Sequence, residues 1–179
     1  MGTSYYFAYG SNMHFGRVIE RLSNARLLEA AILSEHTIRF HKRGRDGSGK
    51  CNVVSDPKRH VAGAIYQLET LALARLDRIE GGGYRRLPVV VRGMRSGRRY
   101  RAYAYMAKAV AIEESLIAYE WYRDIVVAGA VAIGLPTAYV ESLSSFPAQR
   151  DPNARRQRQN AAVLGRAGAA VATLAGGNS

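Results

Sequence analysis

The chain has 179 residues, which is long enough for one domain with a sizeable core and short for two. Apolar residues make up 47% of it and charged residues 22%, an ordinary globular composition that excludes a disordered or fibrous protein. The 26 basic residues outnumber the 14 acidic ones, so the formal net charge is +12 at pH 7. Such a charge favours solubility and is compatible with a polyanionic partner.

Cysteine, histidine and hydropathy patterns restrict the class of protein further. Cys51 is the only cysteine and cannot form an intrachain disulfide, and the four histidines do not cluster with cysteine or acid at metal-ligand spacing. We therefore expect no metal site. The N-terminus lacks the basic start and long apolar stretch of a secretory signal, and the most apolar run, residues 125–133, is too short to cross a bilayer. The sequence predicts a reduced, cytoplasmic protein with no membrane partner.

Strands dominate the first half of the chain. Apolar and aromatic runs predict strands over residues 4–8, 51–54 and 61–68, and two strands within 26–40 that are separated near Ser34-Glu35. The first of these strands leads into a polar turn at residues 9–13, and residues 15–22 have helical composition. The glycine-rich stretch 42–50 is predicted to be a surface loop.

Helices and a hairpin follow in the second half. Apolar residues on one face predict a helix over 69–80, which three glycines end. The strand candidates 87–91 and 99–106 are joined by a five-residue loop at 93–97, which is suited to a hairpin. A long helix with an acidic start is predicted over 113–132, and a short one runs from Pro136 to Leu143.

This order of elements predicts the fold class and the domain organisation. Strands outnumber helices and pair locally, which favours an α+β fold with a mixed, curved or barrel-like β-sheet and flanking helices. We expect one domain over residues 1–147 and a basic Ala/Arg/Gly-rich C-terminal tail over 148–179, which carries five arginines and one acid. A helix is expected around 155–174 and a frayed end at 176–179, and the tail is predicted to be dispensable for chemistry.

The turn at residues 9–13 is the first candidate site. A strand that ends in glycine, serine and asparagine offers backbone N–H groups in a concave arrangement, with small side chains that let a carboxylate or carbonyl oxygen approach. The alternative is a simple strand-to-helix connection in which Ser11 or Asn12 is the helix N-cap. Spacing alone favours this second interpretation.

Glu80 is the second candidate, because it ends a predicted helix immediately before three glycines. A carboxylate there faces the negative end of the helix dipole, which disfavours its ionised form, and a locally poor choice of residue sometimes marks a functional one. The alternative is a solvated glutamate followed by glycine C-caps.

Three other patterns do not carry a function by themselves. Residues 44–50 have the glycine and lysine spacing of a phosphate loop, but Cys51 stands where a Ser or Thr is needed and a strand follows, so we interpret the stretch as a hairpin loop. No histidine or acid identifies a partner for a Ser or Cys nucleophile. The arginines and tyrosines of residues 84–105 are compatible with a surface for single-stranded nucleic acid or with a solvated strand face.

Taken together, several stretches resemble the γ-glutamylcyclotransferase family, which includes AIG2-like proteins. They are Tyr6-Phe7-Ala8-Tyr9-Gly10-Ser11-Asn12-Met13, Leu76-Asp77-Arg78-Ile79-Glu80-Gly81, and Tyr122-Arg123-Asp124-Ile125 through Gly129-Ala130 to Gly134-Leu135-Pro136. Phe40-His41-Lys42-Arg43 with Gly47-Ser48-Gly49-Lys50 also looks like the bacterial members. The resemblance covers roughly residues 4–146 and leaves the tail outside.

This resemblance implies a fold, a reaction and a site. It implies a β-barrel with surrounding helices that cyclises a γ-glutamyl group to 5-oxoproline and releases the amine, with no metal and no cofactor. By position, Glu80 would be the catalytic acid/base, and the substrate-binding residues would be Tyr9, Gly10, Ser11, Asn12, Met13, Tyr84 and Tyr122. The partner is then a small γ-glutamyl substrate.

Alternatives to this reaction stay open. One is an enzyme that removes a γ-glutamyl group from a biosynthetic intermediate, which differs in the amine that it accommodates. Another is a basic nucleic-acid-binding module, which would need neither the 9–13 turn nor Glu80, so nucleic acid is the less favoured partner. The sequence is compatible with a homodimer and does not indicate which amine is released.

Overall fold

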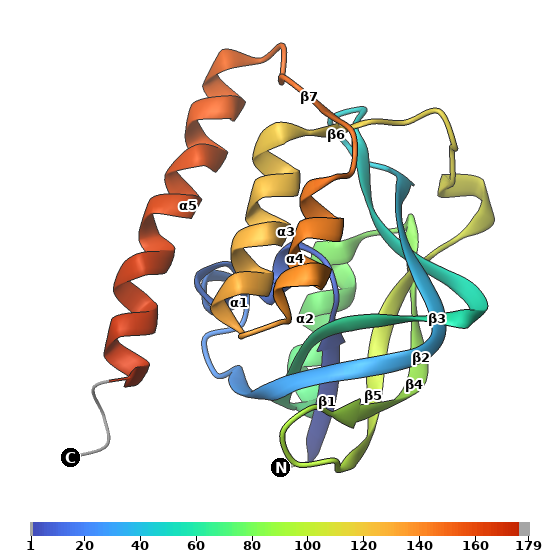
Figure 1. Cartoon of the computed structure of the whole chain (residues 1–179), viewed down its shortest axis with the longest axis vertical. Coiled ribbons are helices and arrows are strands. Elements are labelled where there is room, and N and C mark those ends of the chain that lie inside the picture. The colour runs from blue at the N-terminus through green and yellow to red at the C-terminus, as the bar shows by residue number, and fades with distance from the viewer. Residues whose placement is uncertain (1, 176–179) are drawn as a thin grey trace.

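The computed structural model describes the chain from Gly2 to Ala175, and its side chains as far as Leu164. The predicted frayed end at 176–179 therefore lies outside the described residues. Five strands form a closed barrel in the order β1–β3–β2–β4–β5 (Figure 1). Their bounds are β1 (Thr3–Ala8), β2 (Arg26–Arg43), β3 (Gly49–Glu69), β4 (Tyr84–Gly93) and β5 (Arg99–Ala107).

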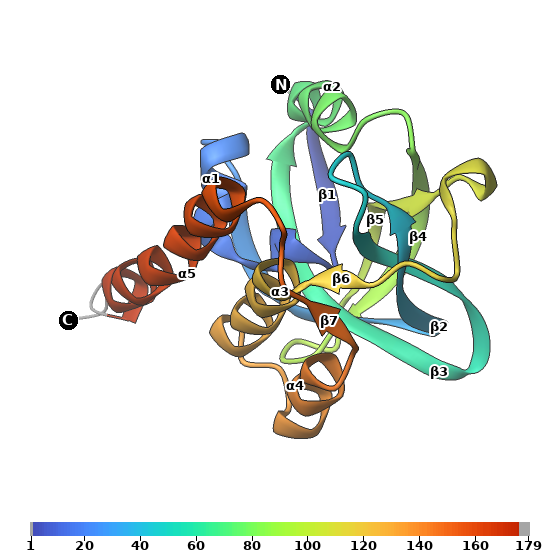
Figure 2. The ribbon, with the colours of Figure 1, turned by 90° about the horizontal axis from the view of Figure 1, so that it is seen from above.

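Helices cover the barrel from outside, which confirms the α+β class and the barrel-like sheet with flanking helices (Figure 2). Their bounds are α1 (Phe15–Arg21), α2 (Thr70–Glu80), α3 (Glu120–Ala132), α4 (Thr137–Ser144) and α5 (Ala154–Ala175). Short 3-10 turns lie at Ser11–Met13 and Ala109–Ala111, and β6 (Ala118–Tyr119) pairs in parallel with β7 (Ala148–Gln149). None of the helices within Gly2–Ala175 combines the length and apolar character needed to span a membrane.

β2 and β3 form one long hairpin, so the predicted division of residues 26–40 into two strands is wrong. Pairing continues on both sides of Glu35, which has a positive φ of 59° where the register shifts. The polar residues that suggested a break form a bulge in a continuous strand. The candidates 51–54 and 61–68 are likewise parts of β3.

The loop between these two strands is confirmed as a hairpin connection, but it is shorter than predicted. β2 extends to Arg43 and β3 begins at Gly49, so only residues 44–48 connect them. Lys42 is 8% exposed and Ser48 is 1% exposed, which corrects the prediction that all of 42–50 is surface loop. The prediction failed because charged and glycine residues are typical of a solvated loop, whereas several residues of this stretch are buried in the structure.

The helix predicted over 113–132 begins later than expected, at the first residue of α3. The two acids that resembled a helix start serve another purpose. Glu113 pairs with Arg43 at 2.8 Å, and Glu114 bonds Nδ1 of His41 at 2.8 Å. These contacts hold an irregular segment against the end of β2. The two acids therefore bind side chains of β2 and do not cap a helix.

The barrel has a weak seam between β2 and β4, where the register contains only two pairs. Glu29 of β2 reinforces it by accepting hydrogen bonds from the backbone N–H groups of Arg95 and Ser96, each at 3.0 Å, and from the hydroxyls of Ser96 and Tyr100 at 2.6 and 2.7 Å. Burial opposes ionisation of this carboxyl, but the hydrogen bonds outweigh it and hold the pKa of Glu29 at about 2. The carboxylate thus joins β2 to the β4–β5 turn.

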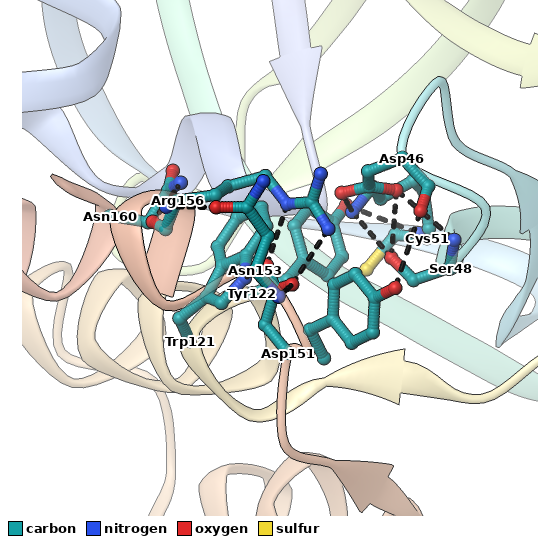
Figure 3. Close-up of polar contacts among 11 residues, drawn as sticks. Asp46, Ser48, Cys51, Trp121, Tyr122, Asp151, Asn153, Arg156 and Asn160 are labelled. Carbon is teal, nitrogen blue, oxygen red and sulfur yellow. Dashed lines mark hydrogen bonds and ion pairs between the residues drawn. The ribbon is translucent and has the colours of Figure 1, made fainter. Parts of the chain in front are cut away.

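α5 is docked onto the body of the protein along its first half, where residues as far as Val163 and Leu164 pack against the core. Its contacts are with α3 and α1, and the anchor is Asp151, which is 3% exposed. The Asp151 carboxylate accepts a hydrogen bond from Trp121 Nε1 at 2.8 Å and two from Arg156, both at 2.6 Å (Figure 3). Because Arg156 donates to it, the pKa of Asp151 is lowered to about 2. The predicted tail helix is confirmed, and it begins beside this anchor.

Replacing Asp151 should therefore loosen α5 in a pH-dependent way. We expect Asp151→Asn to lower the melting temperature by a few degrees at pH 7, because the charged pair with Arg156 is lost. The wild-type advantage is complete above the ordinary aspartate pKa and fades as pH falls toward 2, where the carboxyl becomes protonated. Thermal denaturation of both proteins between pH 2.5 and 7 measures this. Asp124→Asn is the matched control: it removes a partly exposed ion pair with the neighbouring Arg123 on α3, and it should have a smaller effect.

Candidate functional site

The turn after β1 is held in shape by its own backbone. The N–H of Met13 bonds the carbonyl of Gly10 at 2.9 Å, and the N–H of His14 bonds that of Ser11 at 3.3 Å. In a helical turn the first N–H groups have no partner within the turn, so those of Ser11 and Asn12 are directed outward. That the turn binds an oxygen of a substrate stays a prediction.

The alternative helix-cap interpretation of this turn is wrong. Gly10 and His14 occupy the N-cap positions of the 3-10 turn and of α1, and neither element has a side-chain cap bond. The Asn12 side chain instead contacts distant segments: its Nδ2 donates to Glu80 Oε1 at 2.8 Å and to the Tyr6 hydroxyl at 2.9 Å. Its Oδ1 accepts from Arg21 at 2.7 Å.

Glu80 is the last residue of α2, and its side chain is 16% exposed. The alternative interpretation of Glu80 as a solvated glutamate is therefore wrong. Burial raises the pKa of Glu80, whereas Arg21, 3.8 Å away, and the Asn12 amide act in the opposite direction. The result is a carboxyl with a pKa above its ordinary value, held in one orientation. Such a group can accept and return a proton closer to neutral pH than a free glutamate can.

The turn and Glu80 share one small cavity of about 40 Å³. Its walls are rich in tyrosine; it is lined by Tyr6, Tyr9, Gly10, Ser11, Asn12, Cys51, Glu80, Tyr84, Tyr105 and Tyr122. The wall hydroxyls are tied to backbone groups. Tyr84 donates to the Cys51 carbonyl at 2.6 Å, Tyr122 accepts from the Cys51 N–H at 3.1 Å, and Tyr9 donates to the Tyr105 carbonyl. The cavity is thus a rigid, preformed one.

Most of the residues predicted for the site meet at this cavity, and one does not. Tyr9, Gly10, Ser11, Asn12, Glu80, Tyr84 and Tyr122 all line it. The Met13 side chain is fully buried in the core instead, and its carbonyl accepts from Tyr66 at 3.3 Å. Sequence reasoning missed Arg21, and it missed Tyr6, Cys51 and Tyr105 as wall residues. Only Tyr6 carried a signal, since it begins the stretch that resembles the family.

A larger outer chamber of about 250 Å³ adjoins the cavity and shares Ser11, Glu80, Tyr84 and Tyr122 with it. The remaining lining is mostly charged; it consists of Arg17, Arg21, Lys42, Gly44, Arg45, Asp46, Lys50, Ile79 and Trp121. Much of it comes from the β2–β3 turn, and Figure 3 places Asp46 and Ser48 of that turn close to Cys51 and Tyr122.

Across the described part of the chain, no group of three or more His, Cys, Asp and Glu residues could hold a metal ion.

α3 fixes the turn from behind through a glycine. A Cβ atom on Gly129 would lie 2.5 Å from the backbone nitrogen of His14 and 2.8 Å from the carbonyl carbon of Met13. Helix and turn therefore pack backbone against backbone. The same helix carries Tyr122 into the cavity wall, so α3 positions both the turn and the wall.

Comparison with solved structures defines the class of fold. A γ-glutamyl cyclotransferase superposes with a TM-score of 0.82 at 22% identity, covering 92% of this chain and 99% of the other. An uncharacterised human protein gives a TM-score of 0.83 at 23% identity over the same shares of the two chains. A yeast γ-glutamyl cyclotransferase specific to glutathione gives 0.52 at 12% identity, covering 93% and 97%. The barrel with its flanking helices is therefore a γ-glutamyl cyclotransferase-like fold.

Family membership follows from the sequence itself. Residues 6–124 match the family described as "Gamma-glutamyl cyclotransferase, AIG2-like", and the chain belongs to this family. The matched range includes the 9–13 turn, Glu80 and Tyr122. No significant match was found among curated proteins.

The contact at Gly129 gives a test of how the turn is positioned. We expect Gly129→Ala to cost about 1–3 kcal/mol of stability, because the added methyl group must displace backbone. It should also lower any activity of the site at temperatures where the variant is folded, since the turn moves. Denaturant unfolding and turnover measure the two effects. Val131→Ala, at an exposed position on the same helix, is the control, and equal behaviour of the two variants would contradict this view of the packing.

Proposed function

We propose that the protein is a γ-glutamyl cyclotransferase that converts a γ-glutamyl amino acid or amine to 5-oxoproline and the free amine. The observation that carries this proposal is the buried Glu80 carboxyl, whose pKa is raised and which is held by Asn12 of the oxygen-binding turn. A proton-transfer group and an oxygen-binding turn in one rigid cavity are what an intramolecular aminolysis requires.

In the proposed mechanism the substrate supplies its own nucleophile. Glu80 takes a proton from the α-ammonium group, and the freed amine attacks the γ-carbonyl carbon. The N–H groups of the turn stabilise the oxyanion or hold the α-carboxylate, where one donor is worth about 3 kcal/mol. The new C–N bond closes the five-membered ring and the old amide bond breaks. The attacking nitrogen loses a second proton as the ring forms, and Glu80 relays both protons in turn to the leaving nitrogen, which departs as an ammonium group. No water and no external reactant is consumed.

The environment of the only thiol supports a mechanism without a covalent intermediate. Cys51 lines the cavity, but burial raises the pKa of its thiol to about 12. Because the thiolate is the reactive form, this cysteine is a poor nucleophile at neutral pH. That leaves Glu80 as the group in the cavity suited to moving protons.

The structure weakens the case for a nucleic-acid-binding surface, because most of the tyrosines proposed for it are buried or line the cavity. Tyr100 and Tyr105 are each 5% exposed, and their hydroxyls bond Glu29 and Asp77 at 2.7 and 2.6 Å. Tyr84 is directed to the site. These three rings are not available for stacking on bases. Tyr103 is partly exposed, but the Arg86 guanidinium lies over its ring at 5.1 Å from the centroid, so the strand face offers few aromatic rings for stacking.

Glu80→Gln is the first test of the proposal. The amide can still accept the Asn12 hydrogen bond, so we expect the fold to be retained while turnover falls by about 10²–10⁴-fold, because an amide cannot carry the proton. Purified protein is incubated with a panel of γ-glutamyl amino acids and amines, 5-oxoproline is measured by mass spectrometry, and circular dichroism checks the fold. Glu141→Gln, at an exposed position on α4, is the matched control. More than about a tenth of wild-type activity in Glu80→Gln would assign the proton transfer elsewhere.

The pH profile gives a second test, through Arg21. Because the raised pKa of Glu80 must be passed before the carboxylate forms, kcat/KM should rise with pH through that pKa. Arg21 favours the ionised form, so Arg21→Gln should raise the pKa further and move the acid limb of the profile upward by about one pH unit. Arg21→Lys keeps the charge and should leave the limb near its wild-type position. An unmoved limb in Arg21→Gln would contradict the assignment of this limb to Glu80.

A further inference from the structure

The outer chamber beside Glu80 has an excess of positive charge. Five cationic residues line it, namely Arg17, Arg21, Lys42, Arg45 and Lys50, against two acids, Asp46 and Glu80. Lys50 is paired with Asp46 at 2.7 Å, and Arg21 lies 3.8 Å from Glu80. The two acids are thus each matched by one cation, and three cations are left over.

Of the three remaining cations, Lys42 and Arg45 form no ion pair with any carboxylate of the described residues. The third is Arg17, and Glu80 and Glu20 are among the charges that act on it. Arg17 has a buried Nε without a hydrogen-bond partner, and burial lowers its pKa to about 10, which keeps it charged at neutral pH. Lys42 is 8% exposed, and its Nζ lies over the face of Tyr84, 4.6 Å from the ring centroid. Burying a cation without a full set of partners is costly, so an incoming anion would compensate Arg17 and Lys42. Arg45 is exposed, so it adds attraction for an anion without such a cost.

The glycines after α2 make room for two of these cations. A Cβ atom on Gly83 would lie 2.8 Å from Cε of Lys42, and one on Gly81 would lie 3.0 Å from a guanidinium nitrogen of Arg45. Side chains at these positions would push the two cations away from the chamber. The glycine run therefore lets the β2–β3 turn bring positive charge up to the end of α2, next to Glu80.

The position of the chamber relates this charge to the substrate. The chamber and the small cavity share Ser11 and Glu80, so a γ-glutamyl group held at the turn would extend its amide substituent into the chamber. On the basis of the proposed function, we propose that the chamber is a subsite for the leaving amine, and that it selects amines carrying two or more negative charges, such as an acidic amino acid or a phosphorylated one.

The excess of cations over acids in the chamber favours this choice of leaving amine. The γ-glutamyl group has one α-carboxylate, which the turn or one of the cations can take. A neutral amino acid as leaving group adds one more carboxylate, and that still leaves a cation unmatched. A second anionic group on the leaving amine completes the pairing. A leaving group with a basic side chain would instead place like charges together in a partly buried space, which is unfavourable.

A set of γ-glutamyl dipeptides that differ in one group tests this preference. γ-Glutamyl-glutamate and γ-glutamyl-glutamine have nearly the same shape and differ in one charge, and γ-glutamyl-lysine reverses the charge. We expect kcat/KM to be at least about tenfold higher for the glutamate compound than for the glutamine compound, and lowest for the lysine compound. γ-Glutamyl-phosphoserine compared with γ-glutamyl-serine distinguishes a phosphate from a carboxylate. Added salt should reduce the preference.

Variants locate the preference in the chamber. Arg45→Gln and Lys42→Gln should each reduce the ratio of kcat/KM between the glutamate and glutamine compounds by several fold. Arg45 is exposed, so its replacement should be tolerated by the fold even if that of Lys42 is not. Arg39→Gln removes the same charge from an exposed position on the same strand, outside the chamber, and should leave the ratio unchanged.

The outcomes separate this proposal from the proposed function. If 5-oxoproline forms from all the dipeptides at similar rates, or if the ratio is unaffected in both chamber variants, the subsite proposal fails and the cyclotransferase proposal stands. If none of the compounds is turned over, the proposed function fails. Calorimetric titration of Glu80→Gln with the glutamate and glutamine compounds then still reports on the chamber, and equal affinities would overturn the subsite as well.

Discussion

The site depends on one constraint, which is that a carboxylate buried at the end of α2 must be compensated by groups that the chain brings to it. An unpartnered acid in such a place would be strongly destabilising. Asn12, from the turn after β1, supplies a hydrogen bond, and Arg21, from the end of α1, supplies charge. Three segments that are far apart in sequence therefore meet at Glu80, and the cavity exists where they meet.

The surrounding elements keep this meeting point rigid. The barrel fixes the direction of β1 and places the end of α2 opposite it, and α3 packs against the turn through Gly129. α3 is in turn connected to α5 through Asp151, which accepts hydrogen bonds from Trp121 of α3 and from Arg156 of α5. The same Trp121 ring lies 4.6 Å from Nζ of Lys50 at the outer chamber. The C-terminal helix is thus connected to the chamber wall through one buried carboxylate.

Much of the fold could be predicted from the sequence because it depends on local signals. The residues of the candidate site were predicted from the resemblance to the family, since spacing alone favoured a helix cap at residues 9–13. Apolar runs located parts of all five barrel strands, and Glu80 stood out as a locally poor choice of residue at the end of a helix. What failed depended on tertiary structure. The Ser34-Glu35 stretch reads as a break because a bulge has the same polar residues as a turn, and Glu113 reads as a helix start although Arg43 is its partner.

The outer chamber could not be predicted for the same reason. Lys42 and Arg45 lie in a polar, glycine-rich stretch, which in isolation indicates solvent. Only the closure of the barrel turns this hairpin over the end of α2, and only then do its charges face Glu80. Arg21 gave no signal either, since a basic residue at the end of a helix is common and satisfies the helix dipole.

The position of Cys51 has a consequence for the chemistry that the protein tolerates. It is the only thiol in the chain, it is 2% exposed, and its sulfur stays protonated at neutral pH because its pKa is near 12. Oxidants and alkylating agents react with thiolates, so they have little to attack here. The interior of this site is therefore insulated from redox conditions around the protein, and its state is set by protons and by what occupies the cavity.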